Sequence, residues 1–231
     1  METVGITKLL NLDFQVNEAY KTLRSNILFC GSDIKTIGLT SCTPNEGKSS
    51  VSLNLAVSLA EAGKKVVFID GDLRKSVLIG RYKINKVVRG FSHYLSGICT
   101  KEEVIYKANI DELYMIFSGP VPPNPSELLG GDRFTELLEF LREEYDYVII
   151  DTPPLGSVID SAVIAKACDG MVLVIEANAI SYKFVQRVKE QLSKTGCRIL
   201  GAVLNKVDMS ERGYYGKYYG KYYGKYYGNK R

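Results

Sequence analysis

The sequence predicts an α/β fold, a mostly parallel sheet with helices on both faces. Short apolar runs such as TIGLTS, KVVFID and YDYVIID alternate with helical segments along the chain. These runs are apolar throughout rather than at every second position, which is typical of strands buried on both faces. Ligands bind at the carboxyl ends of the strands in such sheets, so the residues after these runs are candidates for a functional site.

The expected elements follow one another in a regular order. Residues 17–29 have apolar positions at helical spacing, and Asn17 is the expected N-cap. The strand TIGLTS leads through a Pro/Gly/Lys turn into the helix SSVSLNLAVSLAEAG, which we expect to end at Gly63. The later elements are the strands KVVFID and LYMIFSG, the loop PVPPNPS, a helix from about Glu127 to Glu144, the strands YDYVIID, DGMVLVIEA and RILGAVLNK, and helices near 158–168 and 181–195.

Composition limits the class of protein. The 231 residues are 45% hydrophobic and 24% charged, which suits one globular core. The longest apolar runs are far too short to span a bilayer, and the N-terminus lacks the layout of a secretory signal, so we expect a cytoplasmic protein. Five cysteines without a C-x-x-C pair and a single histidine provide little material for a zinc site. Residues 211–231 carry +5 and the rest −1, so the folded part is not expected to bind nucleic acid.

The segment TIGLTSCTPNEGKSS predicts a phosphate-binding loop. Gly47, Lys48 and Ser49 fall between a strand and a helix, where backbone N–H groups and the helix N-terminus attract phosphate. Lys48 would reach the β- and γ-phosphates, and the Ser49 hydroxyl would bind Mg²⁺. Cys42 replaces the first glycine of the motif, and Asn45 stands where glycine is common, but asparagine tolerates a left-handed backbone. The predicted nucleotide contacts are Asn45, Glu46, Gly47, Lys48, Ser49, Ser50 and Asn205.

Aspartates follow two further strands. Asp70 and Asp72 come at the end of KVVFID, and Asp151 ends YDYVIID. One carboxylate can hold the metal's water shell while a second accepts a proton from an incoming hydroxyl. The alternative role of an isolated aspartate at a strand end is to cap the next helix. The predicted catalytic residues are Lys48, Asp70, Asp72 and Asp151, and the predicted metal ligands are Ser49, Asp72 and Asp151, with Asp70 as base or ligand.

The C-terminal segment breaks the α/β pattern. A four-residue repeat of Tyr-Tyr-Gly-Lys holds eight of the sixteen tyrosines. Its regular glycine and lysine make a poor helix and a poor core, so we expect a flexible tail. The alternative is a low-complexity segment that stacks on nucleic-acid bases. The tyrosines of this cluster, the predicted phosphorylation sites, are Tyr214, Tyr215, Tyr218, Tyr219, Tyr222, Tyr223, Tyr226 and Tyr227.

The segments SCTPNEGKSS, VVFIDGDLRKS and VIIDTPP resemble the Walker A, A′ and B motifs of bacterial tyrosine kinases, P-loop kinases that regulate capsule and exopolysaccharide synthesis. The resemblance covers nearly the whole chain. It implies a P-loop NTPase fold in three parts: an N-terminal segment with an oligomerisation helix (1–34), a P-loop kinase domain (35–210) and a disordered tyrosine-cluster tail (211–231). It also implies ATP and Mg²⁺ as cofactors and autophosphorylation of the tail, in trans.

The same resemblance implies partners. The family's E-x-x-R-x-x-R motif, which forms subunit contacts in a ring, reads Glu18, Lys21 and Arg24 here, and lysine loses the bidentate geometry of arginine. A separate transmembrane modulator would recruit the protein to the inner face of the cell membrane, and a tyrosine phosphatase would reverse the modification.

Four further residues depart from the motifs or carry no assigned role. Arg74 and Arg133 match family-like positions whose role the sequence does not give. Ser76, with the lysine before it, replaces an Arg-Pro pair often seen after the A′ motif, which is expected to affect only the local loop shape.

Other nucleotide-dependent classes fit less well. Asn205, Lys206 and Asp208 match the guanine-reading N-K-x-D pattern, but Pro154 stands where D-x-x-G would place its glycine. We therefore expect ATP, with Asn205 near the adenine edge. A deviant-Walker partitioning ATPase would carry a second lysine at the position of Thr43. A nucleotide-dependent assembly switch or scaffold without kinase activity is the alternative function.

Overall fold

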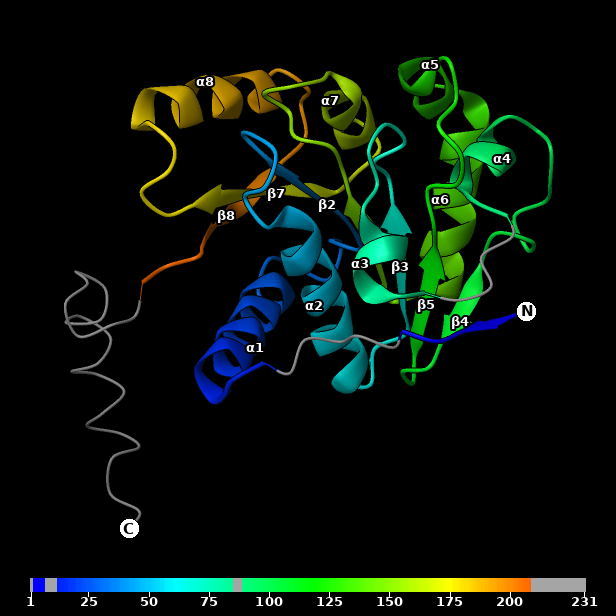
Figure 1. Cartoon of the computed structure of the whole chain (residues 1–231), viewed down its shortest axis with the longest axis horizontal. Coiled ribbons are helices and arrows are strands. Elements are labelled where there is room, and N and C mark those ends of the chain that lie inside the picture. Colours follow the sequence, from blue (N-terminus) through cyan, green and yellow to red (C-terminus); the bar gives the residue numbers. More distant parts are fainter. Residues whose placement is uncertain (1, 7–11, 85–88, 209–231) are drawn as a thin grey trace, which may run out of the picture.

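The computed structural model describes residues 2–6, 12–84 and 89–208 (Figure 1). The strands of this part of the chain form one sheet in the order β1-β4-β5-β3-β6-β2-β7-β8. Their bounds are β1 (Thr3–Val4), β2 (Thr36–Ser41), β3 (Val66–Asp70), β4 (Tyr106–Ala108), β5 (Leu113–Ile116), β6 (Tyr147–Asp151), β7 (Gly170–Glu176) and β8 (Ile199–Asn205).

Neighbouring strands are parallel from β5 through β3, β6, β2 and β7 to β8. The exception is β4, which pairs antiparallel with β5 and parallel with β1. The predicted fold class, a mostly parallel α/β sheet of the P-loop NTPase type, is therefore confirmed. β1 and β4 were not predicted because segments of two and three residues carry no periodic signal.

Helices cover both faces of the sheet (Figure 1). The helix α2 packs against β2, β3, β5 and β6, and α1 packs on α2. The helix α6 contacts β6, and α7 contacts β2. The helix α4 packs on α6, α5 packs on both α6 and α7, and α8 packs on α7. The bounds are α1 (Phe14–Leu28), α2 (Lys48–Glu61), α3 (Leu78–Tyr82), α4 (Phe91–Leu95), α5 (Pro125–Leu129), α6 (Asp132–Glu144), α7 (Asp160–Ala165) and α8 (Tyr182–Ser193).

The strand β3 shows why these strands read as apolar throughout. Val66 and Phe68 pack into the core beneath α2, whereas Val67 and Ile69 pack into the core beneath α6. Successive side chains of a strand point to opposite faces, so a strand between two helical layers needs apolar residues at every position.

Two helix boundaries differ from the prediction. The first helix begins at Phe14, and its N-cap is Asp13, whose carboxylate accepts a hydrogen bond of 2.8 Å from the backbone of Val16. Asn17, the predicted cap, therefore lies inside the helix. The single helix expected from Glu127 to Glu144 is two helices, α5 and α6, because the chain breaks at Gly130–Gly131.

The tyrosine cluster of residues 214–227 lies outside the described residues. Within the ranges that the structure does describe, we find no helix with both the length and the apolar character needed to cross a bilayer.

Candidate functional site

The predicted phosphate-binding loop joins β2 to α2. Lys48 is the first residue of α2, and Gly47 is its N-cap. Asn45 and Gly47 both have left-handed backbones, with φ of 70° and 85°. A Cβ atom at Gly47 would lie 2.1 Å from Nδ2 of Asn205, so both the backbone and the space require glycine there. The loop also closes at Asn45, where asparagine, in place of glycine, adopts the left-handed backbone.

Two side chains predicted to contact nucleotide make hydrogen bonds to the loop and the sheet. The carboxylate of Glu46, 1% exposed, accepts hydrogen bonds from the backbone and hydroxyl of Thr43 and one of 3.0 Å from the backbone of Glu176. Nδ2 of Asn205 donates to the carbonyl of Glu46 at 2.9 Å. Glu46 and Asn205 thus hold the loop against the ends of β7 and β8.

Two further residues of the motif have their own environments. The hydroxyl of Ser50, a predicted nucleotide contact, lies 3.3 Å from the Arg81 guanidinium and 3.4 Å from the Tyr82 hydroxyl, so it faces α3. Cys42, which replaces the motif's first glycine, is fully buried. Burial and the nearby Glu46 carboxylate raise the pKa of its thiol to about 11, so the thiol stays protonated and poorly reactive.

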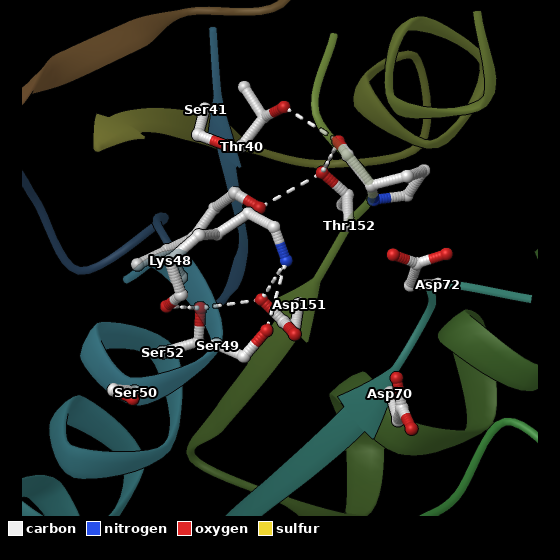
Figure 2. Close-up of polar contacts among 12 residues, drawn as sticks. Thr40, Ser41, Lys48, Ser49, Ser50, Ser52, Asp70, Asp72, Asp151 and Thr152 are labelled. Carbon is white, nitrogen blue, oxygen red and sulfur yellow. Dashed lines mark hydrogen bonds and ion pairs between the residues drawn. The ribbon is translucent and has the colours of Figure 1, made fainter. Parts of the chain in front are cut away.

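The lysine of the motif points at the acid that ends β6 (Figure 2). Nζ of Lys48 lies 2.5 Å from Oδ1 of Asp151 and 3.3 Å from Oγ of Ser49. The hydroxyl of Ser52 donates to the same Asp151 oxygen at 3.0 Å. The side chains of this ion pair are 7% and 1% exposed, so the charges are almost completely withdrawn from water.

Asp70 lies next to this pair, at the end of the neighbouring strand. In the parallel ladder, Asp70 of β3 is the partner of Asp151 of β6. Burial first, and the Asp151 carboxylate second, raise the pKa of Asp70 to about 7, although the hydroxyls of Ser76 and Ser118 and the charge of Lys48 partly oppose this. Oδ2 of Asp70 accepts a hydrogen bond from the Ser76 hydroxyl, and Oδ1 has no hydrogen-bond partner among the described residues.

Asp72 lies two residues beyond the end of β3. β3 ends at Asp70, so the strand geometry does not continue to the second aspartate. Oδ1 of Asp72 accepts hydrogen bonds of 3.2 and 2.9 Å from the backbones of Arg74 and Lys75, which places its carboxylate in a local turn. The strand register pairs Asp70 with Asp151, and the predicted role of Asp72 at the metal stays a prediction.

Arg74, which had no predicted role, connects the loop after β3 to α5 and α7. Its guanidinium donates to both oxygens of Asp160, at 2.6 and 3.0 Å, and to the Ser126 hydroxyl at 3.1 Å. Asp160 is fully buried, and although burial opposes its ionisation, the hydrogen bonds from Arg74 and Ser126 lower its pKa. The sequence analysis did not identify Asp160 as a site residue. The only signal in the sequence is its position at the start of the helix after the DTPP segment.

Arg133, the other arginine without a role, is structural. Its Nε donates to the carbonyl of Tyr94 at 2.8 Å, and its guanidinium lies 4.7 Å from the centre of the Tyr94 ring. Ser76 differs from its expected role as a residue that only shapes the loop, because its hydroxyl contacts Asp70 directly.

The residues near Lys48 fit a magnesium site. Mg²⁺ in nucleotide sites takes one or two protein ligands and completes its shell with phosphate oxygens and water. Ser49 and Asp151 both contact the lysine, and the buried unpaired oxygen of Asp70 needs a donor or a cation. No three His, Cys, Asp or Glu side chains of the described residues cluster closely enough to bind a metal by themselves.

This arrangement can be compared with known proteins. Residues 34–199 match the family described as the AAA domain. The chain is 42% identical over 223 residues to the tyrosine-protein kinase CpsD of Streptococcus agalactiae, which covers 92% of this chain and 97% of that protein. The chain belongs to the bacterial tyrosine kinases.

Solved structures agree with this membership. The chimeric protein CapA2B2 matches this bacterial tyrosine kinase with a TM-score of 0.80 at 34% identity, covering 88% of this chain and 93% of that one. The septum site-determining protein MinD of Pyrococcus horikoshii, solved with Mg-ADP, matches with a TM-score of 0.64 at 27% identity over 78% of this chain and 73% of that one. The fold of this kinase is therefore a nucleotide-binding fold.

Proposed function

We propose that this kinase transfers the γ-phosphoryl group of Mg-ATP to tyrosines, first to those of its own C-terminal cluster. One observation carries the proposal. The buried Asp70, whose pKa is raised to about 7, lies beside the Lys48–Asp151 pair at the edge of the phosphate-binding loop. A carboxylate with this pKa is well suited to accept a proton near neutral pH.

The transfer follows from these positions. The phenolic oxygen forms a bond to the γ-phosphorus, the bond between that phosphorus and the β–γ bridging oxygen breaks, and ADP leaves with the electron pair. The phenolic proton passes to the carboxylate of Asp70. Lys48 and the loop amides neutralise charge on the phosphates, which is the main contribution of a protein to phosphoryl transfer. Mg²⁺, when held by Ser49 and Asp151, adds a further positive charge there.

The loop supports a kinase over a partitioning switch. The position where deviant-Walker ATPases carry a second lysine is Thr43, and its hydroxyl donates to Glu46 at 3.0 Å. Thr43 thus stabilises the loop from within. Because threonine is uncharged, it cannot provide the positive charge that the second lysine gives a deviant-Walker ATPase.

The assembly, partners and location that we propose are those expected of the bacterial tyrosine kinase family. The kinase would assemble as a ring through Glu18, Lys21 and Arg24, phosphorylate the tail in trans, and act on capsule or exopolysaccharide synthesis. A transmembrane modulator would recruit it from the cytoplasm to the inner face of the membrane, and a tyrosine phosphatase would reset it. The similarity to CapA2B2, a chimera of two proteins by its name, supports a modulator partner.

A direct experiment tests this proposal. Purified protein is incubated with Mg-ATP, with and without a modulator fragment, and phosphate is mapped by mass spectrometry. We expect phosphate on several of the eight tail tyrosines, and none in Lys48→Met or Asp70→Ala. A variant with all eight tail tyrosines replaced by Phe should lose self-phosphorylation. Phosphorylation that persists in purified Lys48→Met would contradict the catalytic assignment.

A further inference from the structure

The outer side of α8 is basic. Lys183, Arg187 and Lys194, the C-cap residue, follow one another at intervals of four and seven residues, which places them on one side of the helix. All three are exposed, and so is Lys189 beside them. The side chains on the opposite side pack into the core, and they are Val185, Val188 and Leu192. We call the four exposed cations the basic face of α8.

The basic face has no acidic partner within the described part of the chain. None of its four side chains forms an ion pair or a hydrogen bond with another described residue. Glu190 is the single acid of the helix, so α8 with its C-cap carries a net charge of +3. Cations that fold stability does not use are available to an anionic partner.

The helical layer that contains α8 has an uneven charge. The helix α6 carries five acids against two arginines, a net charge of −3. It lies at the other end of this layer from α8, with α7 between them (Figure 1). An anionic surface would therefore attract the α8 end of the layer and repel the α6 end, which gives the molecule one preferred orientation.

The C-terminal segment starts next to the first turn of α8. The carbonyl of Asn205, the last residue of β8, accepts a hydrogen bond of 2.9 Å from the backbone of Ala177, four residues before the N-cap Ser181. Residues 211–231 lie outside the described residues, begin six positions after Asn205 and carry +5. Two basic segments are thus attached at one corner of the molecule.

Tyrosine accompanies the cations in both segments. Tyr182, the first residue of α8, is 75% exposed and is the one large apolar side chain that this helix exposes. The C-terminal repeat of Tyr-Tyr-Gly-Lys combines the same two residue types. Tyrosine and lysine together are typical of segments at a membrane–water interface, where the ring lies at the headgroups and the ammonium group reaches the phosphates. A protein interface has an apolar centre, which the basic face lacks.

We propose that the basic face of α8 binds the surface of an anionic phospholipid bilayer, together with the cations of residues 211–231. This contact is made by the chain itself and is additional to recruitment by a modulator. It does not depend on catalysis. Polybasic segments bind anionic leaflets with a strength that grows with each cation, so α8 alone binds weakly and the two segments together bind more tightly.

Phosphorylation of the C-terminal tyrosines would weaken this contact, and this consequence rests on the proposed function. Each phosphate adds about −1.5 to −2 charges, so roughly three phosphates cancel the +5 of residues 211–231. Further phosphates make the segment anionic, and the bilayer then repels it. Self-phosphorylation would thus release the kinase from lipid.

The binding test uses the full-length protein, treated with a phosphatase and kept free of nucleotide. Sedimentation with vesicles of phosphatidylglycerol and phosphatidylcholine in equal parts is compared with sedimentation with phosphatidylcholine alone. We expect binding to the anionic vesicles, little to the neutral ones, and a steep loss as salt is added. The double variant Arg187→Glu, Lys194→Glu should lower the partition coefficient at least about tenfold. Both side chains are exposed, so the variant should fold.

A matched control separates the basic face from net charge. Lys64→Glu with Lys107→Glu makes the same change in charge at the end of α2 and in β4, far from α8 in the sheet order. This control should bind within about threefold of the wild type. An equal loss in the control, wild-type binding in the α8 variant, or equal binding to neutral vesicles would each overturn the proposal. A lower oligomeric mass of the α8 variant without vesicles would assign the face to a contact between copies and also overturn it.

The phosphorylated protein tests the release. After incubation with Mg-ATP, mass spectrometry identifies the protein whose C-terminal tyrosines carry phosphate, and its partition coefficient should fall at least about tenfold. Unchanged binding of that protein would overturn the part assigned to residues 211–231. If no phosphate is found, the proposed function fails, whereas the vesicle result for the nucleotide-free protein still decides the basic face.

Discussion

Nζ of Lys48 and Oδ1 of Asp151 are 2.5 Å apart in a pair almost closed to solvent. Lys48 must leave Asp151 to reach a β- or γ-phosphate, and this would strand a buried carboxylate without its cation. Uncompensated buried charge is strongly destabilising. Magnesium arriving with the nucleotide would replace the lysine at Asp151, and the pair would then link release of the lysine to metal binding.

The pair predicts how Asp151→Asn changes nucleotide affinity. Without a carboxylate to hold it, Lys48 is free to contact phosphate when no metal is present. We expect Asp151→Asn to bind ADP in EDTA roughly tenfold more tightly than the wild type, a difference of about 1.4 kcal/mol. In excess Mg²⁺ this advantage should disappear or reverse, because the variant lacks the carboxylate that we propose as a metal ligand. Isothermal titration calorimetry in the two buffers measures both values, and equal affinities in EDTA would show that the pair does not restrain the lysine.

Asp70 predicts a dependence of stability on pH. Its pKa is raised from 3.8 to about 7 in the folded protein, chiefly by burial, so the folded state favours the protonated form. A raised pKa contributes stability that is complete below the unfolded value and is lost as pH rises through the folded value. The window is therefore about pH 4 to 7, and a shift of about three units corresponds to roughly 4 kcal/mol.

The variant Asp70→Asn isolates this effect. Asparagine does not titrate, so the nucleotide-free variant should lose less unfolding free energy than the wild type between pH 5 and pH 8. Urea denaturation at both pH values measures the difference. A pH slope identical to that of the wild type would mean that Asp70 does not titrate in this window. Asp169→Asn is the matched control, since hydrogen bonds from Thr36 and Arg142 outweigh burial and lower the pKa of Asp169, which confines its effect to acid pH.

The sequence was sufficient to predict the features that depend on the pattern of apolar and polar residues along the chain. Apolar runs at strand spacing gave the parallel sheet, and the GKS turn between a strand and a helix gave the loop that the structure contains. The aspartates at strand ends predicted that Asp70 and Asp151 would meet, because the ends of adjacent parallel strands share one edge.

What the sequence could not supply is the direction of individual side chains. Glu46 and Asn205 belong to a motif region, yet their side chains support the loop, and only the register between β7, β8 and the loop decides this. The partnership of Arg74 with Asp160 joins positions 86 residues apart and leaves no periodic trace. The turn that holds Asp72 was also not predicted, because the strand ends two residues earlier than its extension would require.

The support of the loop by Glu46 predicts a graded pair of variants. Its buried carboxylate accepts hydrogen bonds from the Thr43 backbone and hydroxyl and from the Glu176 backbone. Glu46→Ala leaves these donors without partners and should lower the unfolding free energy by about 2 to 4 kcal/mol. Glu46→Gln keeps the shape and part of the bonding and should cost about half as much. Urea denaturation measures both, and equal losses in the two variants would argue that volume, and not hydrogen bonding, holds the loop.

The helix α1 predicts different outcomes for two residues of the proposed oligomer motif. Nη1 of Arg24 donates to the carbonyl of Ser58 at 2.6 Å and lies 3.2 Å from its hydroxyl, so Arg24 fixes α1 on α2 within its own chain. Glu18 pairs with Lys21 on the exposed surface at 2.7 Å, an ion pair that contributes little to the stability of a single chain.

Arg24→Ala should therefore lower both the thermal midpoint of the protein and its oligomeric mass, because it releases the helix that carries the contact. Glu18→Ala should lower the oligomeric mass alone and leave the midpoint within about one degree. Light scattering at matched concentrations and differential scanning fluorimetry separate the two effects. If Glu18→Ala keeps the full oligomeric mass while Arg24→Ala loses it only upon unfolding, then α1 stabilises the chain and does not form a subunit contact, and the ring must be built from another surface.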